Sequence, residues 1–209
     1  MMLVVILSVA MTTACSREHP SVPFYRDASL TPEWLGRNVT ESTAFHRVGA
    51  FALTDQNGQH VTDSALTNRV SVIHFFFARC AGVCPTTYAN IERLLGTLPN
   101  EARVQVLSHS VTPESDSVPA LREYAKMRSL TDSRWHLLTG KRDDIAKLAK
   151  ESYFVNLNNG SSYGVTDLAH TETLVLVDGH GRLRGVYTGT LRLDVDRLGE
   201  DIKSVLAES

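Results

Sequence analysis

Cysteine is scarce in this chain, which has 3 cysteines among 209 residues. So few cysteines exclude a scaffold held together by disulfide bonds, because such scaffolds are short and rich in cysteine. Long apolar runs are also missing: no stretch reaches the roughly 18 to 20 apolar residues that a transmembrane helix requires. Lysine and arginine form no basic run, and the formal net charge is −2. The composition therefore argues against a nucleic-acid partner.

What the chain does contain is enough apolar sequence for a substantial core, with 43% of its residues hydrophobic. Its length fits one domain of about 150 to 170 residues together with an additional terminal segment. No internal repeat is evident in the sequence. We therefore expect a single folded domain.

The first residues have the pattern of an export signal. Residues 1–11 are apolar apart from Ser8, and small residues lead from there to Cys15. A short apolar segment that ends in small residues is typical of a signal peptide, predicted here over residues 1–14. Ala14-Cys15 resembles the end of a bacterial lipobox, in which the cysteine is lipidated and becomes the mature N-terminus. The alternatives are an ordinary signal with a coincidental cysteine, or an uncleaved anchor too short to span a membrane.

The predicted location follows from that signal. We expect a protein of the bacterial cell envelope that faces the periplasm and is anchored to a membrane by lipid on Cys15. Residues 15–44 are mainly polar and include Pro20, Pro23 and Pro32 without sustained periodicity. They are predicted to be a tether between the anchor and a domain over residues 45–209.

Strand and helix patterns alternate along that domain. The strands are expected at 51–54, 59–61, 70–77, 104–107, 135–138, 173–177 and 184–187, and the helices at 80–98, 119–127, 143–153 and 194–206. Asn57-Gly58 supplies the turn of the first hairpin, and the run 70–77 is apolar enough for a central strand. The order predicts an α/β protein with a thioredoxin-like fold. It consists of a central mixed sheet flanked by helices, with an N-terminal β-hairpin extension.

Two cysteines stand directly after the predicted central strand. Cys80 and Cys84 are separated by three residues, which places their sulfurs one helical turn apart on the same face of the predicted helix. This spacing permits a disulfide after local adjustment, and it also presents two thiolates to one soft metal ion. A helix start at Cys80, with Arg79 beside it, favours the thiolate form of Cys80. Because a closed disulfide cannot bind metal, the redox state is predicted to gate metal loading.

The best candidate for a third ligand is His170, which precedes the predicted strand 173–177. A lone histidine is more often a surface or packed residue, but in this fold the loop that enters this strand lies against the thiols. Redox-active relatives place a cis-proline there, and this chain has none. Asp167 is either an acceptor that orients the His170 ring or an ordinary turn residue.

The remaining histidines are weaker candidates. His109 follows the second predicted strand and is expected to be a solvated loop residue, with an auxiliary role as the alternative. His74 lies within the predicted buried strand and is expected to be a core residue whose ring nitrogens have hydrogen-bond partners. His180 lies in a predicted hairpin turn, where a turn role is sufficient.

Several motifs together resemble the Sco/SenC family of copper-handling proteins over roughly residues 45–207. The motifs are Phe75-Phe76-Phe77, Cys80-x3-Cys84-Pro85-Thr86-Thr87, the segment 110–116, Leu121-Arg122-Glu123-Tyr124-Ala125, Trp135-x3-Thr139-Gly140, and His170 ahead of Leu174-Val175-Leu176-Val177-Asp178. The chain departs from the family in having Ala81-Gly82 between the thiols, where Pro-Asp is usual. The resemblance implies copper ligands at Cys80, Cys84 and His170. Two thiolates and one imidazole suit Cu(I), and an added weak ligand allows Cu(II), although zinc also accepts this set.

The function implied by this resemblance is a copper metallochaperone that supplies the dinuclear copper centre of cytochrome c oxidase. Its partner would be the copper-binding subunit of the oxidase. Other periplasmic thiol or copper proteins are further candidate partners. Such a role is binding chemistry without turnover. The main alternative is a thiol-disulfide oxidoreductase that uses Cys80 and Cys84 as a reversible disulfide to reduce the copper-ligand cysteines of a partner. A peroxidase is disfavoured by the context of Cys80, and a copper sensor stays open.

Overall fold

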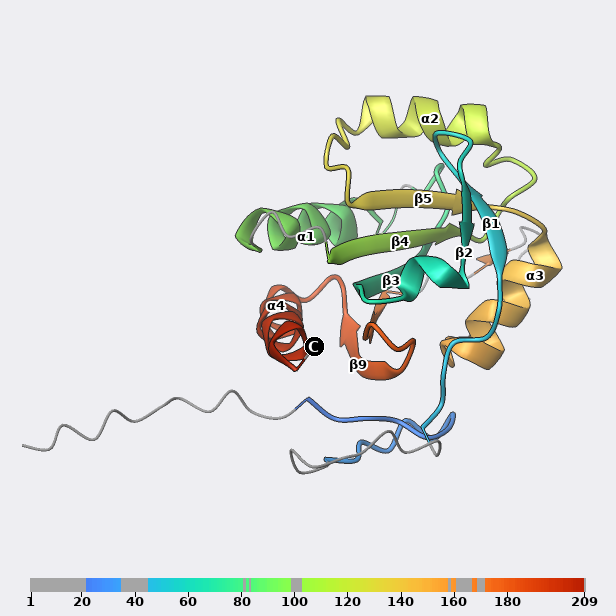
Figure 1. Cartoon of the computed structure of the whole chain (residues 1–209). Coiled ribbons are helices and arrows are strands. Elements are labelled where there is room, and N and C mark those ends of the chain that lie inside the picture. Colours follow the sequence, from blue (N-terminus) through green and yellow to red (C-terminus); the bar gives the residue numbers. More distant parts are fainter. Residues whose placement is uncertain are drawn as a thin grey trace, which may run out of the picture.

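The computed structural model describes residues 22–34, 45–80, 82, 84–98, 103–157, 159–160, 167–168 and 172–208. Within these residues the strands form a seven-stranded sheet in the order β2-β1-β5-β4-β3-β8-β9 (Figure 1). The sheet is mixed, because β3, β4 and β5 pair in parallel and the other neighbours pair antiparallel. The predicted α/β architecture is therefore confirmed.

The centre of the sheet consists of three parallel strands. β3 (Val70–Phe76) pairs with β4 (Val104–Ser110) along its whole length, and β4 pairs with β5 (Trp135–Thr139). Every residue of β3 and β4 is buried. Burial on both faces explains why β3 reads as a continuous apolar run instead of an alternating one.

Two antiparallel hairpins complete the sheet, one at each edge. β1 (Ala52–Asp55) and β2 (His60–Thr62) turn at Gly58, whose φ of 82° suits glycine, and β1 adds to β5. β8 (Thr173–Val177) pairs with β3, and β9 (Leu183–Thr188) pairs with β8. The predicted terminal hairpin and the hairpin extension are both confirmed.

The described residues also contain four α-helices, namely α1 (Cys84–Thr97), α2 (Val118–Met127), α3 (Arg142–Lys147) and α4 (Arg192–Ala207). Beyond α3 the chain continues as a π-helical turn, Leu148–Ser152. Shorter elements are the 3-10 helix Asp63–Leu66 and the two-stranded pair β6 (Asn159–Gly160) and β7 (Asp167–Leu168).

The helix after the thiol segment begins later than the sequence predicts. It was expected from Cys80 but begins at Cys84, so that Pro85 is its second residue. Proline has no backbone N–H, and it would remove an internal hydrogen bond from a helix that began at Cys80. In the first turn that N–H has no helical partner in any case, so the start at Cys84 accommodates Pro85 at little cost.

Side chains alternate between two apolar cores on opposite faces of the sheet. Val72 and Phe76 belong to the core that includes buried side chains of α1, α2 and α4. Ile73 and Phe75 belong to the other core, together with Ile145 of α3. Figure 1 accordingly shows α1 and α4 on one side of the sheet and α3 on the other. The first core is the one that contains the two cysteines.

Residues 22–34, which fall within the predicted tether, contact the domain. Phe24 and Glu33 form an isolated antiparallel bridge, and Val22 and Phe24 are buried. Arg184 of β9 donates hydrogen bonds to the carbonyl oxygens of Val22 and Pro23.

No helix among the described residues is long and apolar enough to cross a membrane.

Candidate metal centre

Cys80 and Cys84 are both free thiols that lie just beyond the carboxyl end of β3. The Cys80 backbone N–H donates to the Phe77 carbonyl at 3.2 Å, which closes a turn between β3 and the thiol segment. Only Cys84 lies in α1, so the predicted arrangement of both sulfurs on one helical face is wrong. Both cysteines are nevertheless buried, at 5% and 1% exposure, and belong to the same apolar cluster.

The chemistry of Cys84 follows from its burial. Desolvation is the main cause that raises the pKa of the Cys84 thiol to about 12, and the neighbouring Cys80 thiol adds to it. The helix N-terminus acts in the opposite direction, but such an interaction contributes only about 0.3 to 1 kcal/mol, less than one pKa unit. Full burial can shift a pKa by about 3 to 5 units. Cys84 is therefore a protonated thiol at neutral pH, and a metal ion must displace its proton.

Asp116 holds the thiol segment to the loop that follows β4, a role that sequence reasoning missed. Its Oδ2 accepts hydrogen bonds from the Ala78 backbone N–H at 3.1 Å, the Ser110 hydroxyl at 2.6 Å and the Thr112 hydroxyl at 3.0 Å. The carboxylate is buried, so these three donors replace its lost water. The available signal was its place in the motif 110–116, which had been used only as a family landmark.

Three predicted site residues cannot be placed from the structure. His170 and Cys15 lie outside the described residues, and for Asp167 only the backbone is described, in β7. Two residues after His170, the backbone of Glu172 accepts a hydrogen bond from Gly189. A Cβ added to Gly189 would lie 2.8 Å from Cγ2 of Thr87 in α1. Glu172 is therefore linked through Gly189 to Thr87 in the first turn of α1.

The other histidines are not part of this centre. His74 is buried and its Nδ1 lies 3.3 Å from the Ser108 hydroxyl, as expected for a satisfied core group. His109 was expected to be solvated, which is wrong: it lies inside β4, is fully buried and stacks on Phe75. The strand extends three residues further than predicted and draws His109 into the core. Burial lowers the pKa of His109 to about 4, so it is neutral.

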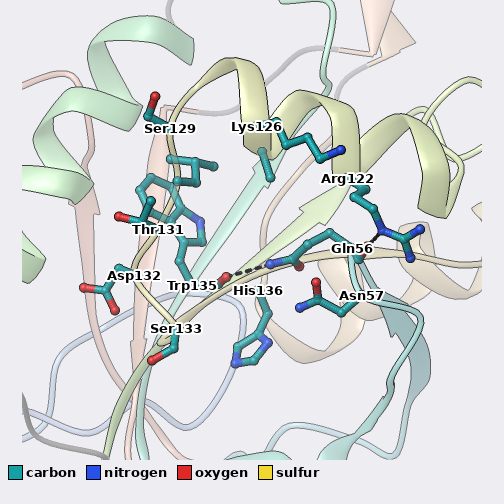
Figure 2. A pocket seen from close by; sticks show the side chains of 12 residues that line it. Gln56, Asn57, Arg122, Lys126, Ser129, Thr131, Asp132, Ser133, Trp135 and His136 are labelled. Atoms are coloured by element: carbon teal, nitrogen blue, oxygen red, sulfur yellow. Dashed lines mark hydrogen bonds between the residues drawn. The ribbon is translucent and has the colours of Figure 1, made fainter.

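A surface cleft lies away from the thiols. It has a volume of about 650 Å³ and is lined by the end of α2, the beginning of β5 and residues that follow β1 (Figure 2). The Gln56 side chain covers the edge of β5 there, donating to the Trp135 carbonyl and accepting from the Leu137 N–H. Trp135 is in register with Val106, whereas the thiols follow the opposite end of the parallel strands. The cleft therefore has no part in the chemistry of the cysteines.

The described residues contain no group of three or more histidine, cysteine or acidic side chains that could hold a metal ion. They do contain two soft donors, the Cys80 and Cys84 thiols, which suit a soft metal ion or form a disulfide with one another. A third cysteine, histidine or acidic ligand in this position would have to come from outside the described part of the chain.

Comparison with known proteins extends this result. A curated relative from Stutzerimonas stutzeri, described as a putative copper-binding protein, is 29% identical over 177 residues, which cover 84% of this chain and 83% of the relative. A crystal structure of a SCO1/SenC family lipoprotein from Bacillus anthracis matches with a TM-score of 0.68 and 26% identity. That match covers 77% of this chain and 95% of the other.

A second solved structure is BsSco, a member of the Sco family of cytochrome c oxidase assembly proteins in which a disulfide switch was identified. It matches with a TM-score of 0.66 and 27% identity, over 77% of this chain and 94% of that one. These neighbours confirm the predicted thioredoxin-like fold. The family model described as SCO1/SenC matches residues 39–207, and the chain therefore belongs to the SCO1/SenC family.

Proposed function

We propose that the protein is a copper metallochaperone outside the cytoplasm, which binds one copper ion through Cys80, Cys84 and His170. The observation that carries this proposal is the pair of free, buried thiols after β3, within the residues that the SCO1/SenC family model matches. Thiolates are ligands for Cu(I), and the apolar surroundings keep competing water away from them. The copper-binding relative supports the choice of metal.

The proposed partner is the copper-binding subunit of cytochrome c oxidase, which would receive copper by ligand exchange. The neighbour BsSco supports this assignment because its family assembles that oxidase. We further propose that lipid on Cys15 anchors the protein with its domain facing the periplasm. A neighbour that is itself a lipoprotein of this family supports the anchor.

His170 is proposed as the third ligand on the position of its neighbours in the chain. Glu172, two residues after His170, accepts a hydrogen bond from Gly189, and Gly189 approaches Thr87 of α1, which supports the proposal that His170 can reach the thiols. Neutral imidazole is a common metal ligand, and it completes a set of two sulfurs and one nitrogen.

An anaerobic copper titration of residues 16–209 tests the proposal. The reduced protein is expected to bind one copper per chain. Binding of Cu(I) is measured by competition with a chelator, and binding of Cu(II) by the absorption band of the Cu(II)-thiolate bond. Cys80→Ser/Cys84→Ser should abolish binding, and His170→Ala should weaken it. His180→Ala is the matched control, because His180 lies in an exposed turn between β8 and β9, and it should bind as the unaltered protein does.

The alternative function is a thiol-disulfide oxidoreductase. It is less well supported, because the three-residue spacing of the cysteines is not the C-x2-C spacing of a general dithiol enzyme, and a Cys84 pKa raised to about 12 makes Cys84 itself a poor attacking group at neutral pH. A protein that binds no copper and still reduces a model disulfide would establish the alternative and reject the metallochaperone. A closed Cys80–Cys84 disulfide would block copper binding, so equal copper affinities of the oxidised and reduced forms would contradict the proposed redox gate.

A further inference from the structure

Gly189, which directly follows β9, is packed tightly between two other parts of the chain. A Cβ added there would lie 2.8 Å from Cγ2 of Thr87 in α1, 3.0 Å from the Glu172 carbonyl oxygen and 3.1 Å from Cγ of Leu174. The φ of Gly189 does not lie in the left-handed region that favours glycine. The lack of space, and not the backbone conformation, therefore requires glycine at this position.

Hydrogen bonds hold the same contact on both sides of Gly189. Its backbone N–H donates to the Glu172 carbonyl, and its own carbonyl accepts from the Asn90 side chain of α1 at 2.8 Å. The Thr190 hydroxyl donates to the Glu172 carboxylate. These bonds join the chain that enters β8 to the chain that leaves β9, and they join both to α1.

The contact lies between the two segments that carry proposed copper ligands. Cys84 is the first residue of α1, and Thr87 lies in the same turn of that helix. Glu172 follows His170 by two residues in the sequence, a separation that spans at most about 7 Å of chain. Gly189 therefore sets how closely the chain that enters β8 approaches the first turn of α1.

We propose that Gly189 and Asn90 are positioning residues of the copper site, which hold the chain that enters β8 where His170 and Cys84 bind the same ion. The inference rests on the proposed function and adds to it the residues that set the geometry of the ligands. Neither residue touches copper, and both act through His170. Substitution of residues that orient metal ligands changes metal affinity about 10- to 100-fold.

The first test is Gly189→Ala in the reduced full chain, purified in detergent, with Cu(I) affinity measured by competition with a chelator. The added methyl group must displace either α1 or the chain that enters β8, so the affinity is expected to fall about tenfold or more. Gly96→Ala is the matched control, because a Cβ at Gly96 of α1 would meet nothing within 4 Å. Its copper affinity should equal that of the unaltered protein.

A double-mutant cycle with His170→Ala separates positioning from a general loss of stability. If Gly189 acts through His170, Gly189→Ala should have little further effect on copper affinity once the imidazole is removed. An equal loss of affinity in both backgrounds would overturn the positioning role while the proposed function stands. An unaltered protein that binds no copper would reject the proposed function itself, and the positioning role with it.

The Cu(II) form provides a readout that a purely structural role would not change. Electron paramagnetic resonance of the unaltered protein is expected to show coupling to an imidazole nitrogen, and this coupling should weaken in Gly189→Ala. Asn90→Ala leaves the Gly189 carbonyl without its donor and should weaken the coupling in the same direction. It also carries the test if Gly189→Ala does not fold. Unchanged coupling in every folded variant would overturn the proposal.

Rescue by a second substitution tests the contact itself. Thr87→Ser keeps the hydroxyl and removes Cγ2, the atom that lies closest to the added methyl group. Gly189→Ala/Thr87→Ser should therefore recover part of the copper affinity that Gly189→Ala loses. A double variant as weak as Gly189→Ala alone would show that the packing of Gly189 on α1 does not position His170.

Discussion

The guanidinium carbon of Arg184 lies 3.9 Å from the centre of the Phe24 ring, in a contact that joins β9 to the N-terminal segment. The same guanidinium donates to the Val22 and Pro23 carbonyls and pairs with Asp178 and Glu208. A buried arginine is tolerated only when its donors are satisfied, so the segment 22–34 and Arg184 depend on one another.

Arg184→Met is therefore expected to lower the free energy of unfolding by about 2 to 6 kcal/mol, because the buried Val22 and Pro23 carbonyls lose their donor and each such group costs about 1 to 3 kcal/mol. Urea unfolding followed by circular dichroism measures this change. Lys203→Met breaks an exposed pair with Glu200 on α4 and should cost less than about 1 kcal/mol. Equal effects of the two substitutions would show that the contact with the N-terminal segment contributes nothing to stability.

Asp116→Ala should destabilise the turn that carries Cys80. It leaves the Ala78 N–H and the Ser110 and Thr112 hydroxyls without their acceptor, and each buried unsatisfied group costs about 1 to 3 kcal/mol. Copper affinity, measured by competition with a Cu(I) chelator, should fall along with stability. Asp116→Asn keeps one acceptor oxygen, so its stability and copper affinity should lie between those of the unaltered protein and those of Asp116→Ala. A stable Asp116→Ala protein with unchanged copper affinity would contradict the positioning role.

The stability of the protein is expected to fall on mild acidification. Burial lowers the pKa of His74 to about 3 and of His109 to about 4, while the unfolded chain binds these protons near pH 6.5. Between pH 6.5 and 4 the unfolded state therefore holds more protons, and stability decreases as the pH falls; above pH 6.5 these groups cause no change.

Each histidine should lower the free energy of unfolding by about 2 kcal/mol between pH 7 and pH 5. This pH interval lies above the range where most carboxylates titrate. Urea unfolding at these two pH values measures the loss. His109→Phe removes one titrating group and suits the contact with Phe75, so its acid-induced loss should be about half as large. A pH-independent stability over this interval would show that both rings gain protons without unfolding.

Copper loading should become stronger as the pH rises. Cys84, with a pKa of about 12, is protonated throughout the neutral range, so each copper that binds must release its proton. The apparent Cu(I) affinity is expected to rise about tenfold per pH unit for that one proton. Competition at pH 6.5, 7.5 and 8.5 measures the slope, and Cys84→Ser should reduce it. A flat profile for the unaltered protein would mean that Cys84 is not a ligand.

The order of strands and helices was predictable because each element has its own periodicity. The apolar run 70–77 predicted the buried strand β3, and Asn57-Gly58 predicted the first turn. The cysteine pair and its surrounding motifs were enough to predict the family that the comparison confirms. These features are local, so the sequence alone determined them.

The tertiary structure decided the environment of each functional group. Nothing local distinguishes a solvated His109 from a buried one, because its burial depends on the packing of Phe75 and Tyr153 around it. Likewise, Cys84 has a raised pKa because residues from α1, α2 and β3 desolvate it together. Asp116 and Arg184 acquire their roles from partners that are 38 and 161 residues away. Burial and long-range hydrogen bonds are properties of the assembled fold, and they set the chemistry of the thiols that the sequence could only locate.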